Sequence, residues 1–147
     1  MAKFTYEDGA DFDGKLDKMS RGTVKTIVMA GADECTKDMQ AAIGNYHHVG
    51  KTGSMQKNVR PGIYHEDLNS GWVEVYPQGT DSRGVSNAKK AFVIDRGIGA
   101  NPTIRSNRKV KNKTGDKFIR KNEKQFKSDV QRAMQAASDR LIADTFK

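Results

Sequence analysis

Apolar residues in the first third of the chain follow a helical pattern. Between Phe12 and Tyr46 they recur every three or four positions, the spacing that places side chains on one face of a helix. Gly22 and Gly31 fall inside this range, and each lowers helix stability by about 1 kcal/mol relative to alanine. We therefore expect one long amphipathic helix over residues 12–46, with a kink or a break near either glycine.

The period changes after this helix. Thr52 is placed to cap a short helix over residues 53–60. Beyond it, apolar and polar residues alternate on both sides of the turn-forming residues 69–71, which read Asn-Ser-Gly. Alternation around such a turn predicts a β-hairpin with strands at 63–68 and 72–76.

The last part of the chain contains the clearest helical pattern. Residues 87–97 predict either a short helix capped by Asn87 or a helix that runs into a strand. Residues 98–117 show neither period, which is typical of a long exposed loop, and loops of this length are usually functional or disordered. A final helix is expected from about Arg120 to Phe146. Its apolar face consists of Phe126, Val130, Ala133, Met134, Ala137 and Leu141.

Together these elements predict an α+β fold in a single domain over residues 1–147. In this fold a small antiparallel β-sheet is covered by a long N-terminal and a long C-terminal amphipathic helix, and residues 98–117 form a long basic loop. The chain has no apolar run of about 18 residues, the length needed to cross a membrane. Its single cysteine, Cys35, excludes an internal disulfide and fits a reducing compartment. We expect a soluble protein that is made inside the cell and has no membrane partner.

The positive charge of the chain is concentrated in one stretch. Between Pro102 and Lys127 there are ten lysines or arginines and two acids, a difference of +8 that equals the formal net charge of the whole chain. Clustered basic residues can neutralise phosphates, whereas a charged run is most often a solvated surface. Only one aromatic residue, Phe118, lies between Phe92 and Phe126 to stack on bases, and no zinc-finger or helix-turn-helix pattern is present. The charge alone therefore leaves open both a nucleic-acid contact and a polar protein surface.

Candidate catalytic and metal-binding residues have no supporting pattern. His47 and His48 are adjacent, so on a helix they point about 100° apart and cannot face one ion as an i, i+4 pair does. His65 stands beside acidic residues without a second spaced ligand. Cys35 lies on the apolar face of the first helix, where a thiol behaves as a small hydrophobe. We expect no enzyme, no metal site and no cofactor.

Three short motifs appear in a characteristic order. The first is a Thr-Gly pair with an apolar residue two places on, the second is an aromatic-Val-aliphatic-acid-x-Gly segment after the hairpin, and the third is a Phe-aliphatic-Arg segment before the last helix. In this order they resemble the tail-completion or head–tail joining family of tailed phages, which also occurs in defective prophages and phage-tail-like bacteriocins. The chain differs from the family pattern where an aspartate replaces the more common glutamate and where Lys121-Asn122 replaces Pro-Ala. The matching positions are Thr52, Gly53, Met55, Phe92, Val93, Asp95, Gly97, Phe118, Ile119 and Arg120.

The resemblance implies a structural virion or tail component and not a catalyst. Family members form rings at the head-proximal end of the tail, as tail terminator, tail completion or head–tail joining (neck) proteins. It therefore implies a homo-oligomeric ring, a hexamer by the sixfold symmetry of tails, with further contacts to tail tube, sheath or connector proteins. The expected location is a virion or phage-tail-like particle assembled in the bacterial cytoplasm.

The resemblance also assigns a role to the basic loop. It would serve as an assembly arm that contacts an acidic neighbouring subunit or faces the channel that DNA crosses. A small basic nucleic-acid-binding protein is the alternative. The residues expected to make these contacts are Arg105, Arg108, Lys109, Lys111 and Lys113.

Overall fold

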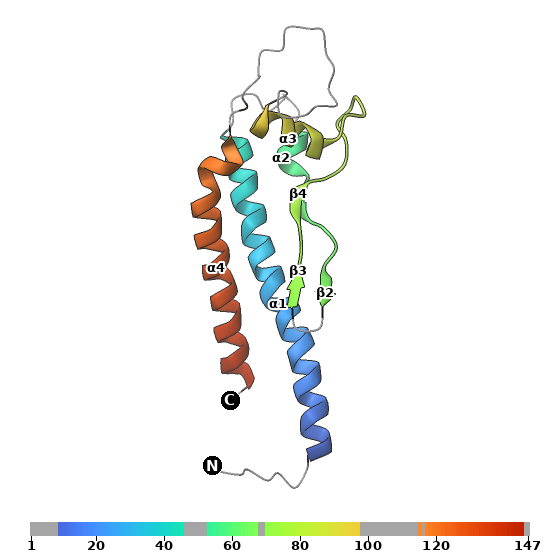
Figure 1. The fold of residues 1–147 in the computed structure, drawn as a ribbon, viewed down its shortest axis with the longest axis vertical. Helices are drawn as coiled ribbons and strands as arrows, with labels where there is room; N and C mark the ends of the chain where they lie inside the picture. Colours follow the sequence, from blue (N-terminus) through green and yellow to red (C-terminus); the bar gives the residue numbers. More distant parts are fainter. Residues whose placement is uncertain (1–8, 46–52, 68–69, 98–114, 116, 146–147) are drawn as a thin grey trace.

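A computed structural model describes residues 9–45, 53–67, 70–97, 115 and 117–145 of the chain, with side chains from residue 22 onward. The predicted α+β class is confirmed, because the structure combines two long helices with a small region of antiparallel strands (Figure 1). The long helices are α1 (Gly9–Gly44) and α4 (Phe118–Thr145). Two short helices, α2 (Ser54–Lys57) and α3 (Asn87–Arg96), precede and follow the strands.

The first helix is longer than expected at its N-terminal end and is unbroken. It spans 36 residues and continues through both Gly22 and Gly31, where a kink or break was expected. At Gly31 a second helix explains the glycine, because a Cβ there would lie 2.8 Å from Cγ of Met134 and 3.2 Å from Cγ1 of Val130. The glycine thus allows α4 to approach the backbone of α1 closely.

The two long helices run antiparallel and side by side (Figure 1). Val130 and Met134, on the predicted apolar face of α4, meet α1 at Gly31. The strands pack on α1, whereas α4 packs on α1 and on α3. The molecule is therefore layered in the order strands, α1 and α4, with α1 in the middle.

The strands form one long hairpin with two short ladders. At its base, β1 (Val59–Pro61) pairs with β4 (Val75–Pro77), and at its tip β2 (His65–Asp67) pairs with β3 (Ser70–Trp72). The hairpin was predicted, but Ser70 and Gly71, which were expected in its turn, belong to β3 and pair with Asp67 and Glu66.

The predicted helix over 53–60 was partly wrong, because α2 ends at Lys57 and residues 59–61 belong to β1. Pro61 was expected to end a helix. Its register with Val75 turns its missing N–H away from β4, so proline is compatible with this strand.

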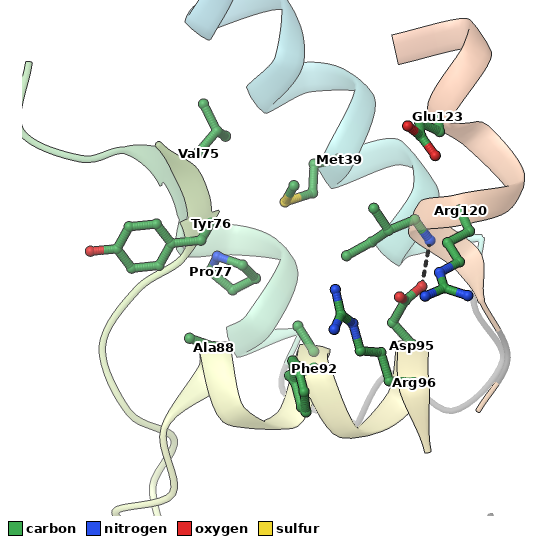
Figure 2. Close-up of a pocket in the computed structure, with 12 residues that line it drawn as sticks. Met39, Val75, Tyr76, Pro77, Ala88, Phe92, Asp95, Arg96, Arg120 and Glu123 are labelled. Atoms are coloured by element: carbon green, nitrogen blue, oxygen red, sulfur yellow. Dashed lines mark hydrogen bonds between the residues drawn. The ribbon is translucent and has the colours of Figure 1, made fainter. Parts of the chain in front are cut away.

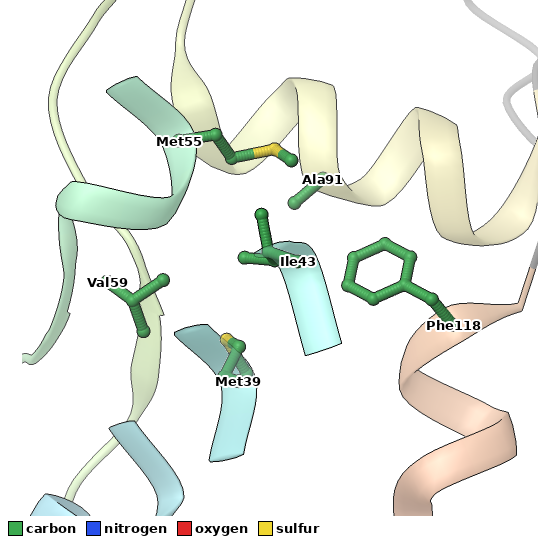
Figure 3. Close-up of a cluster of buried hydrophobic side chains, with 6 residues drawn as sticks. All are labelled: Met39, Ile43, Met55, Val59, Ala91 and Phe118. Carbon is green, nitrogen blue, oxygen red and sulfur yellow. The ribbon is translucent and has the colours of Figure 1, made fainter. Parts of the chain in front are cut away.

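The hydrophobic core lies at the end of the molecule that holds α2, α3 and the start of α4 (Figure 1), and its side chains are drawn in Figure 3. Five separate elements contribute to it, namely α1, α2, β1, α3 and α4. Full burial of a Val, Ile, Met or Phe side chain stabilises a fold by about 1.5–3 kcal/mol, so this cluster is what joins the short elements to the helix pair. The buried residues are Met39, Ile43, Met55, Val59, Ala91 and Phe118.

Candidate functional site

The three sequence motifs meet around this core, at a region here called the motif end, which comprises α2, α3 and the first turn of α4. Met55 of the first motif and Phe118 of the third are both core residues (Figure 3). Gly53 precedes α2 with a φ of 59°, a left-handed conformation that favours glycine. Thr52 lies outside the described residues, and the N-cap of α2 is Gly53, which provides no side-chain hydrogen bond. The motifs are thus neighbours in space.

Asp95 of the second motif is hydrogen-bonded to the third motif. Its side chain is only 4% exposed, and its Oδ1 accepts a hydrogen bond from the backbone N–H of Ile119 at 2.8 Å (Figure 2). Its backbone carbonyl accepts another from the N–H of Lys117 at 2.9 Å. The first N–H groups of a helix have no partner within the helix, and a negative charge there is favourable. Asp95 therefore caps α4 from a distant part of the chain.

Two glycines bring the ends of the basic loop together. Gly97 follows α3 with a φ of 84°, and its N–H donates to the carbonyl of Val93 at 2.8 Å. Gly115 has a φ of 66°, and a Cβ on it would lie 2.3 Å from the carbonyl oxygen of Asp95 and 2.5 Å from the nitrogen of Gly97. The two described residues on either side of 98–114, Gly97 and Gly115, therefore lie next to each other. The five predicted arm residues, Arg105, Arg108, Lys109, Lys111 and Lys113, lie outside the described residues.

A pocket of about 350 Å³ opens beside these contacts, between β4, α3 and the first turn of α4 (Figure 2). We call it the β4–α3 pocket. Most of its walls are apolar, and Met39 of α1 contributes to them. Two of its aromatic residues remain open to solvent, Tyr76 at 40% and Phe92 at 39% exposure. Phe92 is one of the motif positions, but the pocket itself was not predicted. Its walls come from four elements that are separate in the sequence.

Among the charged residues that line the pocket, Glu123 forms an ion pair, whereas the two arginines form none within the described part of the chain. Glu123 forms an ion pair with Lys127 at 3.0 Å, and the hydrogen bond from Lys127 lowers the pKa of the Glu123 carboxyl. The guanidinium of Arg96 lies 5.1 Å from the centre of the Phe92 ring, within the range of a cation–π contact. Within the described part of the chain, neither Arg96 nor Arg120 has an ion-pair partner. Both arginines are exposed, and the charge of Arg120 also contributes to lowering the pKa of Glu123.

Asn87 holds the motif end together but does not cap α3 as predicted. The N-cap is Ser86, whose hydroxyl accepts from the N–H of Lys89. Asn87 is fully buried, and its Nδ2 donates to the carbonyl of Gln78 at 2.8 Å and to Oγ of Ser54 at 3.4 Å. The alternative that this segment runs into a strand is wrong, since α3 continues to Arg96.

Of the candidate histidines and the cysteine, the structure describes His65 and Cys35. His65 is exposed and stacks on Trp72, with 4.2 Å between the ring centres. Cys35 is partly buried in α1, and its burial, followed by the nearby Asp38, raises the pKa of the thiol. A raised pKa leaves less reactive thiolate at neutral pH. His47 and His48 are outside the described residues, and the described residues contain no group of three or more potential metal ligands.

No family model, curated protein or solved structure matches this chain. None of the helices in the described part is both long and apolar enough to cross a membrane. The family relationship therefore stays a prediction from the three motifs.

Proposed function

We propose that the protein is a structural subunit of a phage tail or phage-tail-like particle, which forms a ring at the head-proximal end of the tail. The observation that carries this proposal is that residues of the three motifs contact one another in the fold. Met55 and Phe118 share one small core, and Asp95 caps the helix that begins at Phe118. Motifs that are short and far apart in the sequence thus build one common end of the molecule, as expected if they are required together.

The surface of the subunit supports assembly with other proteins. Large apolar side chains are exposed at well-separated places, including Ile63 at 78%, Trp72 at 50% and Ile142 at 55%. Single exposed apolar residues are common, but an elongated chain with exposed apolar residues on the hairpin, at the pocket and on α4 has several surfaces for neighbours. A ring subunit uses such surfaces on both sides, because each copy contacts two others.

The basic loop fits an assembly arm in this proposal. Residues 98–114 carry five basic and no acidic side chains, and both ends of this segment are anchored at the motif end by Gly97 and Gly115. An arm anchored at both ends can contact a neighbouring subunit, or DNA in the channel, without altering the fold that presents it. Contact with acidic groups would offset the conformational entropy that is lost when the arm is ordered.

The same charge is the one observation that favours a second function, nucleic-acid binding. Beyond the loop, the exposed cations Lys117, Arg120, Lys121 and Lys124 continue along the start of α4. A protein whose main role is to bind duplex DNA would show an affinity that falls steeply with salt, with a slope that grows with the number of phosphates contacted. Duplex binding that is strong at physiological salt, together with a monomeric protein, would support this alternative.

The proposal is tested by removing the gene from cells that produce the particle. Without the subunit, we expect tails that are abnormal in length or not joined to their connector, and a plasmid copy should restore normal particles. A plasmid copy with the five arm residues changed to serine should restore them poorly. Normal particles in the absence of the gene would overturn the proposal.

A further inference from the structure

The β4–α3 pocket has the features of a docking site for an extended peptide. It combines apolar walls with the exposed rings of Tyr76 and Phe92 and the cations Arg96 and Arg120 (Figure 2). Such a site fits a segment that has aromatic side chains followed by acidic ones.

One edge of the pocket can also pair with backbone. The N–H of Gly62 donates to the carbonyl of Glu74 at 2.7 Å, and the N–H of Gln78 donates to the carbonyl of Asn58 at 2.8 Å. In an antiparallel ladder, hydrogen-bonded and non-hydrogen-bonded pairs of residues alternate. Val75 and Pro61 form a non-hydrogen-bonded pair, so the N–H and C=O of Val75 point away from β1. Val75 also lines the pocket. Within the described residues, no hydrogen bond is recorded for the N–H or C=O of Val75, so an added extended segment could pair with them beside the apolar walls.

The N-terminal residues 1–8 of this chain, Met-Ala-Lys-Phe-Thr-Tyr-Glu-Asp, have the matching sequence. Phe4 and Tyr6 alternate with Thr5, so in an extended segment both aromatic rings would lie on one face. Phenylalanine, threonine and tyrosine all favour strands. Glu7 and Asp8 follow directly and supply the negative charge.

These residues cannot reach the pocket of their own chain. The start of α1, Gly9, lies at the opposite end of the molecule from the motif end (Figure 1). Met39, which lines the pocket, is 30 residues further along the same helix (39 minus 9), or about 45 Å at 1.5 Å per residue. Eight residues span at most about 29 Å even when fully extended. If residues 1–8 occupy this pocket, they must therefore belong to another copy of the chain.

We infer that residues 1–8 of one subunit dock in the β4–α3 pocket of the next, with Phe4 and Tyr6 on its apolar walls and Glu7 and Asp8 beside Arg96 and Arg120. This contact joins the two opposite ends of the molecule, so it is a head-to-tail interface, the kind that closes into rings. The inference deepens the proposed function and rests on it, because both require that the chain assembles with itself.

Mixed cross-linking tests the contact directly. Two variants are made in a Cys35→Ser background, one with Thr5→Cys and the other with Ala88→Cys in the pocket wall, and they are mixed and oxidised. We expect a mixed disulfide dimer, and at least about tenfold less of it when the second variant instead carries Ser128→Cys, an exposed position of α4 that does not line the pocket. Equal yields for the Ala88 and Ser128 positions would overturn the inference.

A charge exchange tests the same contact without cysteines. Arg96→Glu with Arg120→Glu should weaken self-association at least tenfold in sedimentation experiments, and adding Glu7→Lys with Asp8→Lys should restore it. Lys89→Glu with Lys124→Glu is the matched control, because these exposed lysines carry the same charge on the same two helices. No difference from the control, or a chain that is monomeric at every concentration, would overturn the inference.

The two proposals fail separately in these experiments. A ring that forms without the mixed disulfide overturns the docking of residues 1–8 and leaves the proposed function intact. A mixed disulfide in a protein whose deletion leaves particles normal supports the docking and overturns the proposed function.

Discussion

Asp95 joins two motifs, so its replacement tests whether the motif end depends on it. Asp95→Ala removes the acceptor for the N–H of Ile119, a partly buried bond of 2.8 Å, and leaves that donor without its partner. Loss of a helix-capping side chain costs about 0.5–2 kcal/mol, and an unsatisfied buried donor costs about 1–3 kcal/mol. The two values describe the same loss and are not summed. We expect the free energy of unfolding to fall by about 2 kcal/mol.

Urea denaturation measures this loss. With a slope of about 2 kcal/mol per M, the midpoint should fall by about 1 M. Asp95→Asn keeps an acceptor oxygen but loses the charge at the start of α4, so it should cost only about 0.5–1 kcal/mol. Asp139→Ala is the control, because Asp139 is an exposed residue of α4 that accepts a hydrogen bond from Gln135 of the same helix. It should change stability by less than about 0.5 kcal/mol. If Asp95→Ala is no more destabilising than this control, Asp95 does not fasten α4.

Three further predictions concern other parts of the chain. Gly22→Ala should stabilise the protein by about 0.5–1 kcal/mol in urea denaturation, because nothing lies within 4 Å of an added Cβ. Gly31→Val should destabilise it by about 1–3 kcal/mol, because the added side chain would clash with Met134. Effects of the same sign would contradict the packing of α4 on α1. The pKa of Asp81 is lowered to about 2, mainly by the hydrogen bond from Lys90. The ionised carboxyl therefore stabilises the fold fully above its unfolded pKa of about 3.9, and this stabilisation is lost as the pH falls toward about 2. The difference in urea midpoint between the parent and Asp81→Asn should shrink between about pH 6 and about pH 2.5, and a constant difference would contradict this. Changing five arm residues to serine should leave the melting temperature nearly unchanged while impairing particle assembly, and unfolding of this variant would place the loop in the core; these residues are Arg105, Arg108, Lys109, Lys111 and Lys113.

The long helices and the hairpin could be predicted because their signals are local. The apolar period of α4 and the alternation on both sides of residues 69–71 each belong to one stretch of chain. The error at residues 58–61 arose because Pro61 ends a helix and also suits the edge of a strand, and only the pairing with β4 distinguishes the two. Similarly, Ser86 and Asn87 both suit a helix cap, and only the burial of Asn87 against α2 and β4 decides between them.

The site was harder to predict because it depends on contacts between distant residues. The motif order singled out Asp95 and Ile119, but no local pattern showed that one caps the helix of the other. The pocket could not be predicted, since Val75, Phe92 and Arg120 come from three elements with no shared period. One signal was available, the strongly apolar Phe92 beside the cation Arg96 at the end of a short helix.

The most direct test of the account is the position and copy number of this chain in the assembled particle. Electron-microscopic reconstruction of tails, with the chain located by a C-terminal tag, would show both. We expect six copies in one closed ring at the head-proximal end of each tail. A particle that lacks the chain, or that holds a single copy, would contradict it.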